Sequence, residues 1–262
     1  MITLYDFDSA LPGRGMSLFV WRVRFALNIK GIEYKTEWLN YAKLEEELKE
    51  RDVSPSTVHP DGTGFFSVPA IHDPATNTTV SDSHRILQYL DEAYPNTPQI
   101  CTHPNALTDE FLKAAFEVGW LVPIDLLRKG MWGVLAPNVV KYQMDEAGTI
   151  KARKKIEGRL LSGMPFESLL EEVKQRELLE EARQGYADVA ATLDKIRAQY
   201  GGQGPWLLGE HVKLPDLAIA GSLAWVVSIV GEESELWKDI RKWDGGSWGR
   251  LWDQWKPYHK LL

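Results

Sequence analysis

The sequence predicts an α/β domain with a mixed four-stranded sheet, followed by an all-α domain. Segments with strand and helix patterns alternate up to residue 94, and nearly all later segments have helical periodicity. Residues 95–104 lie between them and contain three prolines and few residues that could pack, which is typical of a linker. We therefore expect one domain at residues 1–94 and the other at residues 105–262.

Composition restricts the class of protein. The chain has 262 residues, 44% of them apolar and 26% charged, which is typical of a globular protein with a sizeable core. The net charge of −7 argues against nucleic acid as the main partner. The single cysteine, Cys101, excludes an intramolecular disulfide, and six scattered histidines do not indicate a metal site. Without a membrane-spanning run or a signal-peptide pattern, we expect a cytoplasmic protein that does not act at a membrane.

The first domain begins with a βαβ unit. Residues 2–6 alternate in the manner of a strand, residues 18–29 have helical periodicity between Ser17 and Gly31, and residues 34–39 form a second strand. The strands of such a unit are parallel. Residues 42–51 are mostly polar and predict an exposed helix.

A hairpin and a helix complete this domain. A short strand at residues 68–72, which contains a proline, is joined to a strand at residues 78–81 by the turn Asp73-Pro74-Ala75-Thr76-Asn77. The following helix begins at Asp82-Ser83 and runs to residue 94. Because the hairpin adds an antiparallel pair to the parallel one, the sheet is mixed.

The second domain consists of helices, which we expect at about residues 106–136, 145–161, 166–200, 214–230 and 247–259. Pro123 should kink the first of them. Residues 214–230 hold one charge, Asp216, and predict a buried central helix. Residues 151–159 contain five basic residues, which we interpret as a solvated helix face rather than a nucleic-acid patch.

Tryptophan is unusually frequent, with 11 copies, of which five fall within residues 237–262. Trp248, Trp252 and Trp255 are spaced so that they share one face of a helix. This spacing favours a folded C-terminal segment packed on the helical domain over a surface that binds aromatic ligands.

Three positions could bind a ligand, and each has a purely structural alternative. Pro69 fits an edge strand, but a cis Val68-Pro69 bond would leave the Val68 backbone free to pair with an extended peptide ligand. Asp82 and Ser83 could simply cap their helix, or offer a hydroxyl and unpaired amides to a carboxylate. Ser17 could likewise be a helix cap, or stabilise a thiolate at the positive end of the helix.

In this order, the segments resemble the thioredoxin-like domain of the glutathione transferases, and residues 2–262 are similar to the family throughout. The resemblance rests on four segments: the strand, loop and helix around Ser17; Ser67-Val68-Pro69-Ala70-Ile71; residues 80–91; and the helix entered by residues 207–216. Residues 11–31 and the turn at residues 73–77 are most similar to the fungal, etherase-like (FuA) class. That class has a catalytic serine where this chain has Ser17, usually followed by Pro-Asn, whereas Leu18-Phe19 follow here.

The resemblance implies a thioredoxin-like domain that binds glutathione as co-substrate, without a metal. Ser17 would be catalytic and hydrogen-bond the glutathione sulfur. Val68, next to Pro69, would pair with the cysteinyl backbone, and Asp82 with Ser83 would hold the γ-glutamyl group.

The rest of the site is less specific. We expect the glycine carboxylate to be held by the loop before Pro69, with His59 as a candidate. The helical domain would contribute a hydrophobic substrate pocket, for whose wall the candidates are Met16, Phe19 and Trp120. Cys101 does not match the catalytic position and is interpreted as structural.

The implied activity is attack of the glutathione thiolate on hydrophobic, aromatic electrophiles, by conjugation or by cleavage of an aryl ether. The alternative is a ligandin-like protein that binds aromatic or polyphenolic molecules with little turnover. The family also implies a homodimer. The late helix departs from the family, because Lys213 replaces the usual Ser or Thr cap and leaves only the Asp216 half of a capping box.

Overall fold

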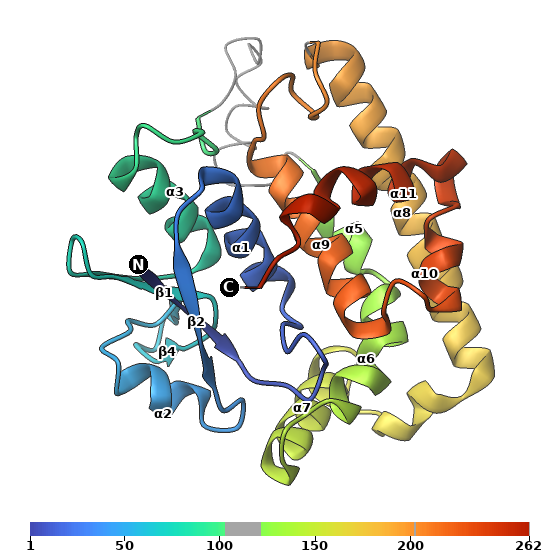
Figure 1. Cartoon of the computed structure of the whole chain (residues 1–262). Coiled ribbons are helices and arrows are strands. Elements are labelled where there is room, and N and C mark those ends of the chain that lie inside the picture. Colours follow the sequence, from blue (N-terminus) through green and yellow to red (C-terminus); the bar gives the residue numbers. More distant parts are fainter. Residues whose placement is uncertain (103–121, 202, 262) are drawn as a thin grey trace.

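The computed structural model describes residues 1–102, 122–201 and 203–261 and consists of two parts that lie side by side (Figure 1). The α/β part comprises β1 (Ile2–Phe7), α1 (Leu18–Lys30), β2 (Tyr34–Leu39), α2 (Leu44–Lys49), β3 (Thr57–Val58), β4 (Gly64–Phe65), β5 (Ala70–Asp73), β6 (Thr78–Ser81) and α3 (Ser83–Ala93). The helical part comprises α5 (Ile124–Arg128), α6 (Met131–Lys141), α7 (Glu146–Arg159), η1 (Phe166–Leu170), α8 (Glu172–Tyr200), α9 (Leu214–Val230), α10 (Glu235–Ile240), α11 (Trp243–Trp255) and η2 (Lys256–Tyr258).

The main sheet is the mixed four-stranded sheet that the sequence predicts, in the order β2-β1-β5-β6. β1 and β2 are parallel, whereas β5 is antiparallel to both β1 and β6. Pro69 lies just before β5 rather than inside a strand, because a proline has no amide for the ladder, so the predicted strand begins too early. The short strands β3 and β4 form a separate hairpin that the periodicity does not predict.

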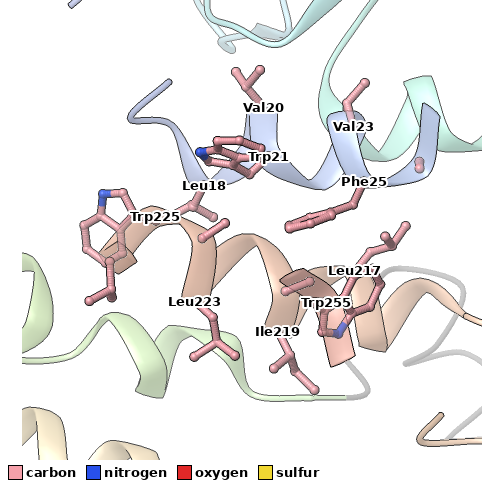
Figure 2. Packing of buried hydrophobic residues seen from close by; sticks show 14 of the residues in the cluster. Leu18, Val20, Trp21, Val23, Phe25, Leu217, Ile219, Leu223, Trp225 and Trp255 are labelled. Carbon is pink, nitrogen blue, oxygen red and sulfur yellow. The ribbon is translucent and has the colours of Figure 1, made fainter. Parts of the chain in front are cut away.

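Helix α1 joins the two parts by packing on α9, as Figure 2 shows. Leu18, Trp21 and Phe25 point toward α9, and Val20 and Val23 point to the opposite side. Both sides of α1 are therefore buried, which explains why apolar residues surround most of this helix. Helix α9 is itself buried along nearly its whole length, which confirms the predicted central helix.

The helix predicted at residues 106–136 is interrupted in its described portion. Pro123 precedes α5 instead of kinking a continuous helix, and α5 ends at Arg128 before α6 begins at Met131. Gly130 separates the two with φ +68°, and a Cβ atom there would lie 2.2 Å from the carbonyl oxygen of Leu178 on α8. The break therefore occurs where the backbone touches α8, a tertiary contact that local periodicity cannot predict.

The C-terminal tail folds back toward α1 (Figure 1). The predicted packing of the tail is confirmed, because Trp248 and Trp252 are 0% exposed and Trp255 is 1% exposed. The Asn28 side-chain amide of α1 donates to the carbonyl of Tyr258 at 2.8 Å. The tail thereby connects the last helix to the α/β part.

No helix in the described ranges is both long and apolar enough to cross a membrane. The predicted boundary between linker and second domain, at residues 104 and 105, falls outside the described residues and stays a prediction.

Candidate functional site

Three segments with predicted site residues meet at one edge of the main sheet. Because β5 is antiparallel to β1 and to β6, the end of β1, the start of β5 and the end of β6 lie at the same edge. The loop after β1 leads to Ser17, Val68-Pro69 leads into β5, and Asp82 follows β6. This edge is the candidate functional site.

Ser17 is the N-cap of α1, and its Oγ accepts a hydrogen bond from the Val20 amide at 3.4 Å. The cap uses a lone pair of the oxygen and leaves the hydroxyl hydrogen free to donate to a ligand. The positive end of the α1 dipole lies at the same place and favours a negative charge there. The structural and the functional interpretation of Ser17 are therefore compatible.

Val68 lies outside the ladders of the sheet. The first paired residue of β5 is Ala70, which lies opposite Tyr5 on β1 and Ser81 on β6. The Val68-Pro69 peptide bond is cis. The Val68 backbone is thus not used by the sheet pairs and can serve a ligand at the edge.

Asp82 caps α3, as the structural alternative proposed, because its Oδ1 accepts from the amides of His84 at 3.0 Å and Arg85 at 3.2 Å. Asp82 has φ +79°, which is unfavourable for a residue with a Cβ atom, and strained residues of this kind cluster at functional sites. Ser83 takes no part in this cap, so its hydroxyl and amide remain for an anion at the positive helix end.

A cavity of about 310 Å³ lies beside Ser17. Two of the predicted wall residues, Met16 and Phe19, line it together with Ser17, whereas Trp120 lies outside the described residues. The helical part contributes Trp132 and Trp225, whose ring centroids are 5.5 Å apart. The wall is therefore aromatic and comes from both parts of the chain.

Three cations line the same cavity, and sequence analysis assigned none of them to the site: Arg128 of α5, and Lys155 and Arg159 of α7. Both α7 side chains are exposed, as expected for a solvated face, but that interpretation misses that they also face the cavity. The signal was present, because Lys155 and Arg159 share a helix face with the buried Ala152 and Ile156.

The remaining candidates lie away from the cavity. His59 is exposed in the turn between β3 and β4, and its role stays a prediction. Burial raises the pKa of Cys101 to about 12, so its thiol stays protonated at neutral pH, in line with a structural residue. Within the described ranges, no group of three or more His, Cys, Asp or Glu could hold a metal ion.

Comparison with protein families identifies the class. The glutathione S-transferase N-terminal domain matches residues 16–93, and the glutathione S-transferase C-terminal domain matches residues 127–258. The second match alone spans half of the chain, and the chain belongs to the glutathione S-transferase family. Its fold, a thioredoxin-like domain with a mixed sheet followed by helices, is the fold of that family.

Two of the similar proteins with known structures come from fungi. A glutathione S-transferase of Ceriporiopsis subvermispora, solved in complex with glutathione, is 28% identical with a TM-score of 0.84, and the match covers 100% of this chain and 98% of that one. GSTFuA2 of Phanerochaete chrysosporium is 30% identical with a TM-score of 0.80, covering 100% and 99%. The likeness to the FuA class is thereby confirmed.

A further relative is also similar over nearly the whole chain. The glutathione S-transferase-like protein ustS of Aspergillus flavus is 26% identical over 259 residues, which covers 95% of this chain and 87% of that protein.

Proposed function

We propose that this transferase binds glutathione and, through Ser17, activates its thiolate for attack on hydrophobic, aromatic electrophiles. The observation that carries the proposal is that Ser17 lies at the positive end of α1 and opens on a cavity with aromatic walls. The glutathione complex of the Ceriporiopsis relative supports glutathione as the co-substrate. By the same resemblance we propose a cytoplasmic homodimer.

The chemistry follows from the free hydroxyl of Ser17. By donating a hydrogen bond, the hydroxyl stabilises the thiolate over the thiol without becoming a nucleophile itself. The thiol proton leaves to solvent, the sulfur forms a bond to the electrophilic carbon, and the leaving group departs with the electron pair. The leaving group is a halide in conjugation and a phenolate in the cleavage of an aryl ether.

Contacts of Val68, Asp82 and Ser83 would orient the rest of the glutathione tripeptide. Val68 would pair with the cysteinyl backbone because its own amide and carbonyl lie outside the sheet pairs. Asp82 and Ser83 would hold the ammonium and carboxylate of the γ-glutamyl group, respectively, at the start of α3.

Replacement of Ser17 tests the mechanism. We expect Ser17→Ala to lower kcat for a chlorinated nitroaromatic on the order of a hundredfold, the cost of removing one preorganised donor, with little change in glutathione affinity. Ser17→Thr keeps the hydroxyl and should retain most of the activity. Because the alanine variant also loses a helix cap worth about 1 kcal/mol, unfolding is measured alongside. Unaltered turnover in the alanine variant would remove Ser17 from the mechanism.

The aromatic wall also supports the second candidate, a ligandin-like binder with little turnover. A substrate screen separates the two. It includes a chlorinated nitroaromatic, an α-aryloxy ketone and a glutathionyl phenacyl thioether, which report conjugation, ether cleavage and deglutathionylation. Tight binding of aromatic molecules without turnover of any of the three would favour the ligandin.

A further inference from the structure

Among its described lining residues, the cavity beside Ser17 combines aromatic rings with an excess of positive charge. Arg128, Lys155 and Arg159 all line it, and among the described lining residues there is no Asp or Glu. The whole chain is acidic, with a net charge of −7, so this local excess of cations runs against the overall composition.

The two α7 cations at the cavity, Lys155 and Arg159, have no partner of opposite charge among the described residues. In the described part of the chain, neither Lys155 nor Arg159 forms an ion pair or a hydrogen bond through its side chain, although the nearby Arg153 pairs with Glu167. Desolvation, followed by repulsion from Arg159, Lys151 and Arg128, lowers the pKa of Lys155. Lys155 is therefore repelled by positive charges of two helices, α7 and α5.

Arg128 is only partly neutralised. Its Nη1 contacts Asp125 at 3.0 Å, but that carboxylate is 88% exposed, which weakens the pair. In the described ranges, the other guanidinium donors of Arg128 have no hydrogen-bond partner, and its guanidinium carbon lies 5.7 Å from the centroid of the Phe19 ring.

Arg22 adds a further cation behind the same ring. Its guanidinium carbon lies 5.0 Å from the Phe19 ring centroid, and its Nε and Nη2 are buried without a hydrogen-bond partner in the described ranges. Burial, followed by repulsion from Arg128, lowers the pKa of Arg22 to about 10, so it remains charged at neutral pH. Asp125 and Asp82 offset part of this repulsion, and an anion beside Phe19 would offset more of it.

We propose that this cavity selects aromatic electrophiles that carry a negative charge, such as a carboxylate or a sulfonate. The ring contacts Phe19, Trp132 and Trp225, and the anion pairs with Lys155 and Arg159. These cations also offset the repulsion between the glutathione thiolate and an anionic acceptor. The inference rests on the proposed function, because it takes the cavity as the place where the electrophile meets the sulfur.

The competing role of these cations is to hold the glycine carboxylate of glutathione. Acceptor binding is favoured because the cations belong to the same wall as the three aromatic rings, whereas Val68, Asp82 and Ser83 lie at the sheet edge. A kinetic comparison separates the two roles, since one changes the KM of the acceptor and the other changes the KM of glutathione.

The test compares a chloronitrobenzoate with its methyl ester, which has the same reacting carbon but no charge. In both, the sulfur–carbon bond forms, chloride leaves with the electron pair, and the thiol proton goes to solvent. We expect the double variant Lys155→Gln/Arg159→Gln to lower the ratio of kcat/KM for the acid to that for the ester about tenfold, as for one lost charge-assisted contact. The KM for glutathione should not change.

The matched control is Lys154→Gln/Arg183→Gln, which removes the same charge from exposed positions that do not line the cavity. It should leave the acid-to-ester ratio as in the parent. The inference is overturned if the Lys155/Arg159 variant leaves the ratio unchanged, or if it raises the KM for glutathione equally with both acceptors.

A binding measurement keeps the inference testable if the parent turns over neither acceptor, which would count against the proposed function alone. Fluorescence titration with anilinonaphthalene sulfonate is compared with its uncharged parent, N-phenylnaphthylamine. We expect the Lys155/Arg159 variant to bind the sulfonate about tenfold more weakly and the uncharged dye equally well. Equal weakening for both dyes, or for neither, would overturn the anion preference.

Discussion

Ser17 and Asp82 each begin a helix and each lie at the candidate site. Both caps accept hydrogen bonds from helix amides, through Ser17 Oγ on α1 and Asp82 Oδ1 on α3. A cap of this kind satisfies only some of the free amides, and the positive helix end remains. At the residue scale, stability and ligand binding therefore depend on the same side chains, and variants have to separate the two.

The double variant Asp82→Asn/Ser83→Ala makes that separation. Asparagine keeps an oxygen that can cap α3 and removes the charge, and alanine removes a hydroxyl that the cap does not use. We expect glutathione to bind about tenfold or more weakly, as for the loss of a charge-assisted contact, with little change in thermal stability. Calorimetric titration with glutathione and retention on immobilised glutathione measure the effect.

Gln88→Ala is the control for this prediction, because it changes an exposed side chain of the same helix. It should bind glutathione like the parent. If the Asp82/Ser83 variant also binds like the parent, the anion site has been misplaced.

At the element scale, the sequence predicts what is locally encoded. The strand at residues 2–6, the Ser17 and Gly31 ends of α1 and the turn before β6 all depend on neighbouring residues, and each is found in the structure, although β1 is buried on both faces instead of alternating. The α9 terminus likewise keeps the predicted half of its capping box, with Asp216 Oδ2 accepting from the Lys213 amide at 2.9 Å. Local patterns therefore accounted for most of the α/β part.

The rest depends on packing between distant segments. The break between α5 and α6 occurs where Gly130 meets α8, and the cations of α7 become part of the site only because that helix lies against the cavity. The Gly130 contact leaves no mark within a window of neighbouring residues. The spacing of the α7 cations shows that they share a face with buried residues, but not that a cavity lies beside that face. The site was thus predictable at its helix ends and at Met16 and Phe19 next to Ser17, but not where the helical part supplies the cavity wall.

The contact between α1 and α9 requires a glycine at position 221 of α9, so a larger residue there should destabilise the protein. A Cβ atom at Gly221 would lie 2.6 Å from the Leu18 carbonyl oxygen and 2.8 Å from Arg22 Cγ. We expect Gly221→Ala to destabilise the protein by about 2 kcal/mol, because the two helices must move apart. Since Leu18 follows Ser17, turnover should also fall.

Gly158→Ala on α7 is the matched control, because no atom lies within 4 Å of a Cβ atom built there. In an exposed helix, alanine should stabilise by about 0.5–1 kcal/mol relative to glycine. Urea denaturation measures both variants. Stabilisation at both positions would show that helix propensity, and not the contact with α1, determines the outcome at Gly221.

At the scale of the whole molecule, the tail closes a long loop between the last helix and the first. Besides the Asn28 contact, the Tyr34 hydroxyl donates to the Lys260 carbonyl at 3.2 Å, and the His259 ring stacks on Trp21 with centroids 4.1 Å apart. Trp21 belongs to the same helix that Ser17 caps. Docking of the tail therefore supports the helix on which the proposed chemistry depends.

The half-buried imidazole of His259 in this contact makes the docking of the tail sensitive to acid. Burial lowers the pKa of His259 to about 4, opposed by Glu232 and reinforced by Arg24 and Lys256. Because the folded pKa lies below the unfolded value of about 6.5, the full stability is present above that pH and is lost as the pH falls toward 4. Between about pH 7 and pH 5 the loss amounts to about 2 kcal/mol.

His259→Phe should remove this part of the pH dependence, because phenylalanine can stack on Trp21 but takes up no proton. We expect the stability difference between about pH 7 and pH 5 to be about 2 kcal/mol smaller in the variant than in the parent, by urea denaturation at each pH. Burial raises the pKa of Asp6 and Asp216 to about 6. The parent and the variant both keep these groups, so their opposite contribution to the pH dependence cancels in the comparison.

His211→Gln is the control, because it changes an exposed histidine, and it should show the pH dependence of the parent. An identical pH dependence in parent and His259→Phe would show that the tail stays docked with a protonated histidine, and that acid acts elsewhere in the fold.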